Sequence, residues 1–337
     1  MYRKFYGLKE KPFEITVDPR YFYLSETHKE ALANLVYAVQ ERKGFAVITG
    51  EAGTGKTTLV QTLLSRLGSN TRTAFLFNPR LDSNSDFLYS ICEDLELAGE
   101  KGNKVDYLIR LNHYLMDCYS KKEDVVIIID EAHTLGPELL EEVRLLTNLE
   151  NPSSKLLQVI LLGQPELDNI LNRPQFRALK QRINVRYRLK PLNQKETEEY
   201  IKRRLRVAGA RSTHLFTPGA LRKVYHYSKG VPRLINTVCD NALISGYAGE
   251  DGIIDVGIIR DVISDREGKI PGSRRKFFFA AAGIAGVSLV LGVLYYYGPA
   301  EIGETVRTIG EKIWQYGKLG LKGIVAVLEQ RFAPFLS

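Results

Sequence analysis

The sequence predicts an α/β fold in which a parallel sheet carries helices on both faces, followed by a small all-helical domain. Short β-branched runs alternate with stretches of helical periodicity as far as about residue 193, and such alternation is typical of a parallel sheet. A glycine-rich turn at residues 50–57 lies between a predicted strand and a predicted helix. From Gln194 onward the strand-like runs stop and helical patterns remain, which predicts the second domain.

The elements follow in a regular order. Residues 1–40 form an entry segment, in which Ser25 or Thr27 is the expected cap of a helix from Glu30 to Gln40. The expected strands are at residues 45–49, 73–77, 125–129, 157–162 and 184–189. The expected helices are at residues 58–64, 84–98, 104–120, 137–149, 194–208, 217–228, 231–247 and 255–264. This order assigns residues 1–193 to the α/β domain and residues 194–265 to a helical lid domain.

The strongest motif is G-x-x-x-x-G-K-T, which is characteristic of a phosphate-binding loop (P-loop). A glycine-rich turn that leads into a helix points backbone N–H groups at one position, where the helix N-terminus adds partial positive charge. Lys56 can then reach the β- and γ-phosphates of a nucleotide, and the Thr57 hydroxyl can ligate Mg²⁺. The residues predicted to bind nucleotide are Gly50, Glu51, Ala52, Gly53, Thr54, Gly55, Lys56, Thr57 and Thr58.

Two acids follow the apolar strand at residues 125–129. A strand this apolar is buried on both faces, and it delivers Asp130 and Glu131 at the end of the sheet where α/β folds bind ligands. Asp130 suits the coordination shell of Mg²⁺, and Glu131 suits polarising a water for attack on the γ-phosphate. His133 completes the letters D-E-A-H, but a helicase of that type needs a second ATPase-like domain, for which the chain shows no pattern. His133 is therefore interpreted as an ordinary loop or surface residue.

Three further polar positions fit a nucleotide-hydrolysing oligomer. Gln164 follows the apolar strand at residues 157–162, where its side chain could contact the attacking water. Arg182 precedes the last predicted strand, and Arg233 opens a helix of the lid domain. Arginine near a γ-phosphate stabilises transition-state charge, whether it comes from the same subunit or from a neighbour. Taken singly, each arginine is more often a surface residue, so the spacing relative to the two motifs carries this prediction.

The composition limits which classes of protein this sequence can belong to. The chain has 337 residues, of which 44% are hydrophobic, and a formal net charge of +8. Residues 177–206 contain 11 Lys and Arg against 3 Asp and Glu, so this stretch alone carries +8. Such a stretch can bind nucleic acid, anionic lipid or phosphate, or it can be a solvated helix face. Cys92, Cys118 and Cys239 fit no metal or redox pattern and are expected to be buried thiols.

The end of the sequence predicts a membrane anchor. After a basic linker at residues 266–276, residues 277–297 contain no charge and are long enough to cross a hydrocarbon core. Arg274, Arg275 and Lys276 precede this span and three tyrosines close it, which favours a cytoplasmic N-terminal part. Residues 298–337 show one apolar stripe of an amphipathic helix, which could lie on the membrane or pack on a partner helix.

Taken together, these residues resemble the AAA+ ATPases. The resemblance makes residues 50–57 the Walker A motif, Asp130 and Glu131 the Walker B motif, Gln164 sensor 1, Arg182 the arginine finger and Arg233 sensor 2. Within that superfamily, residues 1–265 are similar to the secretion ATPases of the general secretion pathway protein A (ExeA) type and of exopolysaccharide and PEP-CTERM loci. The more specific matches are Phe5-Tyr6-Gly7-Leu8, Lys11-Pro12-Phe13, residues 18–25, Gly163-Gln164-Pro165-Glu166-Leu167 and Gly230-Val231-Pro232-Arg233.

The resemblance also implies which residues hold the adenine and which group of relatives matches better. In this family the N-terminal segment helps to hold the adenine, which would give that role to Phe5, Tyr6 and Leu8. Secretion-pathway members carry a peptidoglycan-binding domain after the membrane span, whereas here a tail of 40 residues follows. The exopolysaccharide-locus relatives, which often lack that domain, are therefore the better match.

The expected function is a membrane-anchored ATPase that uses ATP and Mg²⁺. It is expected to form a homo-oligomeric ring in the bacterial inner membrane, with a cytoplasmic ATPase domain and a periplasmic tail. Its expected partner is an inner-membrane protein of secretion or polysaccharide export. One alternative is a DNA-binding AAA+ ATPase of the transposition-helper type, in which residues 177–206 would hold phosphates. A third reading is a passive scaffold that binds nucleotide as a switch.

Overall fold

The computed structural model describes residues 2–14, 18–77, 83–97, 99, 102–151 and 154–268. Met1–Arg266 form one compact unit. The predicted membrane helix, the tail and most of the linker before them lie outside the described residues. Within the described part of the chain, no helix combines the length and the apolar character needed to cross a membrane.

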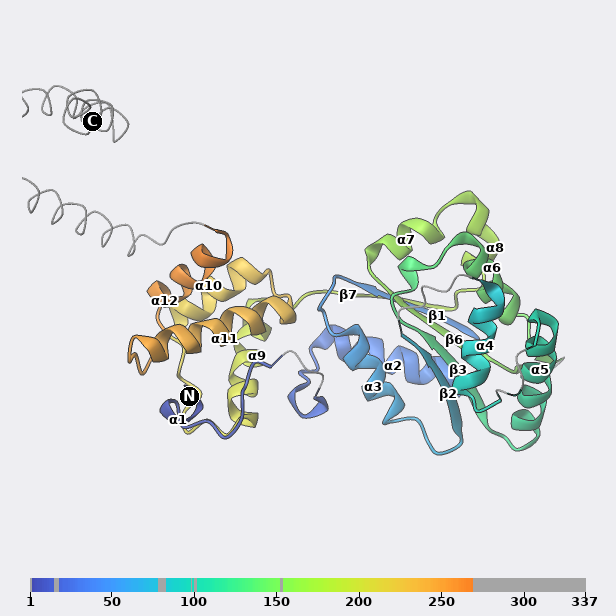
Figure 1. Cartoon of the computed structure of the whole chain (residues 1–337), viewed down its shortest axis with the longest axis horizontal. Helices are drawn as coiled ribbons and strands as arrows, with labels where there is room; N and C mark the ends of the chain where they lie inside the picture. The colour runs from blue at the N-terminus through green and yellow to red at the C-terminus, as the bar shows by residue number, and fades with distance from the viewer. Residues whose placement is uncertain are drawn as a thin grey trace, which may run out of the picture. The chain divides into compact units, whose positions relative to one another are not determined.

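Five parallel strands form the central sheet, in the order β2-β3-β6-β1-β7 (Figure 1). Their bounds are β1 Phe45–Gly50, β2 Thr71–Leu76, β3 Asp124–Ile129, β6 Gln158–Gly163 and β7 Val185–Leu189. The five expected strands and the parallel sheet are thereby confirmed. Because β1, β3 and β6 are neighbours and run the same way, the polar residues after them meet at one edge of the sheet.

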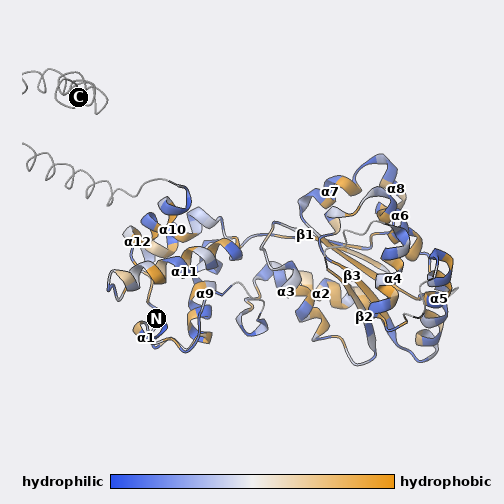
Figure 2. Ribbon diagram, viewed as in Figure 1, coloured by the Kyte–Doolittle hydropathy of each residue, from blue (hydrophilic) through white to orange (hydrophobic). Residues whose placement is uncertain are grey.

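Helices cover both faces of the sheet, and the alternation of strand residues decides which core each side chain joins. In β3, Val126 and Ile128 pack with α2 and α3, whereas Val125, Ile127 and Ile129 pack with α4 to α7. Figure 2 shows the strands as mostly hydrophobic, as expected for a sheet buried on both faces. The bounds of these helices are α2 Glu26–Gln40, α3 Lys56–Leu64, α4 Asn84–Asp94, α5 Lys104–Ser120, α6 Pro137–Leu146 and α7 Pro165–Leu171.

Three helix ends differ from the sequence expectation by three residues or more. Helix α2 begins at Glu26, because the Ser25 side chain accepts a hydrogen bond from the backbone N–H of His28 and so caps the helix. Helix α4 ends at Asp94, and Glu96 just beyond it has a left-handed φ of 59°. Helix α6 ends at Leu146, before the short antiparallel pair β4 Glu150–Asn151 and β5 Ser154–Lys155.

Helices α9 to α12 pack around a separate apolar core, which the first residues of the chain complete. The bounds are α9 Gln194–Val207, α10 Pro218–Ser228, α11 Pro232–Ala248 and α12 Val256–Arg266. The short helix α1 Tyr2–Phe5 lies against α11, where the Tyr2 hydroxyl donates a 2.6 Å hydrogen bond to Asp240. Phe13 and Tyr21 are buried in the same core. The N-terminal segment therefore packs on the helical region, although it is far from it in sequence.

Gly230, between α10 and α11, gives a test of this packing. Its φ is +78°, and a Cβ atom there would lie 1.8 Å from the carbonyl oxygen of Leu192. We expect Gly230→Ala to lower the free energy of unfolding by at least ~2 kcal/mol, from left-handed strain and steric overlap. The measurement is urea unfolding of the full-length protein. Gly68→Ala is the control, because nothing lies within 4 Å of that position; equal losses in both variants would contradict the prediction.

Candidate nucleotide-binding site

The P-loop joins the end of β1 to the start of α3. Gly53 and Gly55 have φ values of 79° and 97°, which favour glycine. A Cβ on Gly53 would lie 2.5 Å from the Cβ of Arg233, and one on Gly55 would lie 3.2 Å from His28 Nε2. The loop is thus enclosed by a residue of α11 on one side and a residue of α2 on the other.

Lys56 is folded back onto this loop. Its Nζ donates to the carbonyl oxygens of Gly50 at 2.8 Å and Glu51 at 3.2 Å, and the side chain is buried. Burial lowers the pKa of Lys56, although Glu131 and Asp130 act in the opposite direction. The ammonium group therefore stands at the phosphate end of the site without a carboxylate bound directly to it, and a phosphate oxygen could replace its carbonyl partners.

The two nucleotide motifs meet through one hydrogen bond. The Thr57 hydroxyl donates to Asp130 Oδ2 at 2.7 Å, and Asp130 Oδ1 accepts from the backbone N–H of Glu131 at 2.8 Å. Asp130 is only 3% exposed. One hydroxyl and one carboxylate fit Mg²⁺, which usually keeps several waters and takes one or two protein oxygens beside the substrate phosphates. In the described part of the chain, no cluster of three or more His, Cys, Asp or Glu side chains could hold a metal by itself.

Glu131 lies next to Gln164 and His133. Gln164 Nε2 is 3.4 Å from Glu131 Oε2 and 3.2 Å from His133 Nε2, and His133 Nδ1 is 3.3 Å from the same Glu131 oxygen. Glu131 has a φ of 52°, a sparsely populated conformation for a residue with a side chain. His133 was expected to be an ordinary loop or surface residue; it does lie in the turn after β3, but its side chain is only 16% exposed and contacts Glu131 and Gln164. No periodic pattern marks this position, since its role depends on the neighbouring strand.

The two predicted arginines lie in different places. Arg233 begins α11 beside Gly53, and its backbone N–H approaches the Gly53 carbonyl at 3.4 Å. Arg182 follows α8 Arg177–Lys180 and lies at the end of α6, where its guanidinium donates to Arg144 O, Thr147 Oγ1 and Asn148 Oδ1. Arg182 does not line the nucleotide cavity of its own chain. The structure therefore brings Arg233 to the P-loop and leaves Arg182 away from it.

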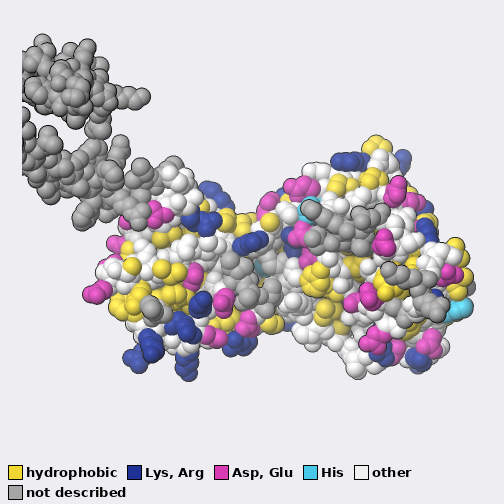
Figure 3. Space-filling view, in the orientation of Figure 1, with side chains coloured by type: hydrophobic (Ala, Val, Ile, Leu, Met, Phe, Trp, Pro, Cys, Tyr) yellow, Lys and Arg dark blue, Asp and Glu magenta, His cyan; other side chains and the backbone are white. Residues whose placement is uncertain are grey.

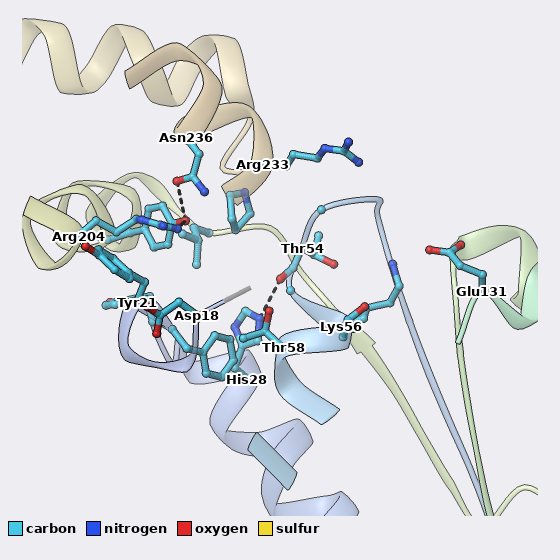
Figure 4. Close-up of a pocket in the computed structure, with 18 residues that line it drawn as sticks. Asp18, Tyr21, His28, Thr54, Lys56, Thr58, Glu131, Arg204, Arg233 and Asn236 are labelled. Carbon is cyan, nitrogen blue, oxygen red and sulfur yellow. Dashed lines mark hydrogen bonds between the residues drawn. The ribbon is translucent and has the colours of Figure 1, made fainter. Parts of the chain in front are cut away.

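A cavity of about 390 Å³ extends from the P-loop to the helical region (Figure 4). Its far end has an aromatic and amide lining that the sequence did not reveal. Arg204 Nη1 donates to the Tyr200 hydroxyl, which donates in turn to Asn236 Oδ1, each at 2.8 Å. The Arg204 guanidinium lies 4.7 Å from the centroid of the Tyr21 ring. The full lining is Asp18, Tyr21, Phe22, Tyr23, His28, Gly53, Thr54, Gly55, Lys56, Thr57, Thr58, Glu131, Leu192, Tyr200, Arg204, Pro232, Arg233 and Asn236.

The N-terminal residues expected to hold adenine are not those that line the cavity. Tyr6 and Leu8 are buried in the helical core, and the Tyr6 hydroxyl donates to Asp251 O at 2.9 Å. Phe5 packs edge-on against Tyr6 and Tyr247. The N-terminal segment does reach the cavity, but through residues 18–23. The aromatic run at those positions was visible in the sequence, yet local pattern could not tell which aromatics face a ligand.

The basic stretch at residues 177–206 is spread over α8, β7 and α9. Arg182 is held by α6, Arg186 forms an ion pair with Asp168 at 2.5 Å, and Arg204 is buried. On the face drawn in Figure 3, basic side chains lie in small groups interspersed with acidic ones. Some of the positive charges in this stretch are therefore hydrogen-bonded, ion-paired or buried within the fold. The three cysteines are free and buried, as expected.

The fold and this site resemble those of the AAA+ class of ATPases. Residues 39–171 match the family model for the AAA domain. Two solved structures share the fold at low identity. The origin recognition complex of Drosophila bound to DNA has a TM-score of 0.60 and 16% identity, over 76% of this chain and 64% of that one. Cdc6p from Pyrobaculum aerophilum has a TM-score of 0.57 and 14% identity, over 75% of this chain and 70% of that one.

The chain is also similar to a curated relative within this class. The chain is 46% identical over 250 residues to General secretion pathway protein A of Aeromonas hydrophila, which covers 74% of this chain. The chain spans 45% of the length of that relative. The similarity expected from the N-terminal and Gly-Gln-Pro-Glu-Leu segments is thereby confirmed.

Arg204 offers a test of how the far end of the cavity is built. Its guanidinium donates to Pro12 O and Glu14 O and so ties the N-terminal segment to α9. We expect Arg204→Met to lower the free energy of unfolding by ~1–3 kcal/mol, since two carbonyl groups lose their donor. Limited proteolysis should also cleave the N-terminal segment faster. Arg203→Met is the control, because Arg203 is exposed on the same helix; unchanged proteolysis in Arg204→Met would contradict the prediction.

Proposed function

We propose that this chain binds ATP with Mg²⁺ in the cavity and couples its hydrolysis to a bacterial envelope secretion or exopolysaccharide-export system. The observation that carries the nucleotide part is the 2.7 Å hydrogen bond between Thr57 and Asp130, which joins the P-loop to the end of β3. It brings the P-loop, the Thr57–Asp130 pair and the second carboxylate, Glu131, to one edge of the sheet. The similarity to General secretion pathway protein A supports the secretion part.

Each residue of the site has a defined task in this proposal. The backbone N–H groups of the P-loop and Lys56 bind the phosphates, while Thr57 and Asp130 hold Mg²⁺. Bound Mg²⁺ would neutralise charge on the β- and γ-phosphate oxygens. Glu131 accepts a proton from the attacking water, and Gln164 beside it orients that water. The left-handed backbone of Glu131 and its contacts with His133 fix the direction of the carboxylate.

The position of Arg182 supports the proposed ring. This arginine lies away from its own cavity and is held at the end of α6, so it can stabilise transition-state charge only at the site of a neighbouring copy. Arg233 acts within its own chain, from the start of α11. Hydrolysis would then change the contact between copies and between α11 and the P-loop, which is how the site would drive movement.

The proposed location is the bacterial inner membrane, with the ATPase part in the cytoplasm. It is supported by the uncharged span at residues 277–297 and the basic residues before it, which favour a single crossing with the tail on the periplasmic side. The proposed partner is an inner-membrane protein of the export machinery. Conformational change in α9 to α12 would reach that partner through the linker.

A pair of substitutions tests the chemistry. We expect Lys56→Ala to reduce ATP binding to background, because the buried ammonium that faces the phosphates is lost. We expect Glu131→Gln to bind ATP with nearly native affinity but to lower kcat by at least ~100-fold, since the amide cannot accept the proton. Calorimetric titration and phosphate release measure the two effects. Hydrolysis at the native rate by Glu131→Gln would refute the role given to Glu131.

The ring is tested by size. We expect the detergent-purified protein to form a larger assembly with ATP than without it, because nucleotide would order the contact that Arg182 makes with the neighbour. Light scattering coupled to size exclusion measures the mass. In Arg182→Ala, hydrolysis should fall by ~10³-fold while ATP affinity stays near native. A monomer at all ATP concentrations that hydrolyses ATP at the native rate would contradict the proposal.

A further inference from the structure

His28 is a buried residue that the proposed chemistry does not use. It lies in the first turn of α2 and is 2% exposed, with the Phe22 ring packed edge-on at 5.3 Å. Its two ring nitrogens contact different parts of the chain. Nδ1 is 2.5 Å from the Ser25 hydroxyl, and Nε2 is 2.9 Å from the carbonyl oxygen of Thr54 in the P-loop (Figure 4).

These contacts define which nitrogen carries the proton. A carbonyl oxygen can only accept a hydrogen bond, so Nε2 must donate to Thr54. The Ser25 oxygen already accepts the backbone N–H of His28, and it can accept from Thr27 at 3.0 Å, so its own proton is available for Nδ1. Burial lowers the pKa of His28 and keeps the ring neutral, as this arrangement requires.

The bond to Thr54 fixes the direction of the next backbone N–H. The peptide unit between Thr54 and Gly55 is planar and trans, so its C=O and N–H point in opposite directions. A carbonyl held toward His28 therefore turns the Gly55 N–H away from α2. His28 Nε2 would lie only 3.2 Å from a Cβ at position 55, so the ring packs closely against this glycine.

We propose that His28 is a positioning residue that holds the Thr54–Gly55 peptide so that the Gly55 N–H faces the phosphates of the bound nucleotide. This inference rests on the proposed nucleotide site. His28 also connects the two ends of the cavity. Phe22 packs on the His28 ring, and it lines the cavity together with Tyr21 and Tyr23. The N-terminal segment thereby affects how the P-loop binds the phosphates, without contacting the phosphates itself.

The test compares two amides at position 28 of the full-length protein. The amide nitrogen of Gln reaches about as far as Nε2 of His, whereas that of Asn reaches only as far as Nδ1. We expect His28→Asn to weaken ADP binding ~10-fold, the loss of about one buried hydrogen bond. His28→Gln should stay within ~3-fold of wild type. Binding of adenosine, which has no phosphate, should be the same in all three proteins.

The outcomes separate this inference from the proposed function. Native ADP affinity in His28→Asn, or equal weakening in the Gln and Asn variants, would overturn the positioning role. Equal weakening for ADP and adenosine would indicate that His28 only supports the fold, and would also overturn it. If the wild-type protein itself binds no ADP, the proposed function fails and this inference fails with it.

A measurement without substitution keeps the inference testable if a variant does not fold. Long-range ¹H–¹⁵N correlations on the wild-type protein report which ring nitrogen of His28 is protonated. We expect the neutral tautomer with the proton on Nε2, in the free protein and in the ADP complex. The tautomer with the proton on Nδ1 could not donate to Thr54 and would rule out the proposed role.

Discussion

The bond between the Thr57 hydroxyl and the Asp130 carboxylate is the contact on which the rest of the site depends. It exists because β1, β6 and β3 are adjacent and parallel, so that the P-loop and the acids leave the sheet at the same edge. Asp130 is buried there and uses its second oxygen on the backbone of Glu131. The residues proposed to bind metal and phosphate and to activate water are thereby positioned by the edge of the sheet.

The cavity has a second wall that the sheet does not supply. Helices α9 and α11 contribute Tyr200, Arg204 and Asn236, which form one continuous chain of hydrogen bonds. Arg204 also binds two carbonyl groups of the N-terminal segment, so the start of the chain and the helical region form one packed unit. A nucleotide in this cavity would contact both the sheet edge and that unit, so hydrolysis as proposed would act directly on the helices.

Two histidines support the site through the residues that they contact. His133 lies against Glu131 and Gln164, and His28 binds the P-loop carbonyl of Thr54. Each of the two histidines restricts a group that is proposed to act on the nucleotide, so neither has to contact the nucleotide itself. His28 is buried and His133 is mostly buried, and the two nitrogens of each ring contact two different groups.

The sequence by itself determined the parallel sheet, the P-loop, the two acids and the helical character of residues 194–266. These features depend on local periodicity and on motifs whose residues are adjacent in the chain. It also predicted Gln164 and Arg233 near the site, from their spacing relative to the two nucleotide motifs. The tertiary structure decided the lining of the cavity, the partners of His28 and His133, and the separation of Arg182 from its own site. Those outcomes depend on contacts between residues as far apart as Pro12 and Arg204, and packing of that range leaves no periodic trace in the sequence.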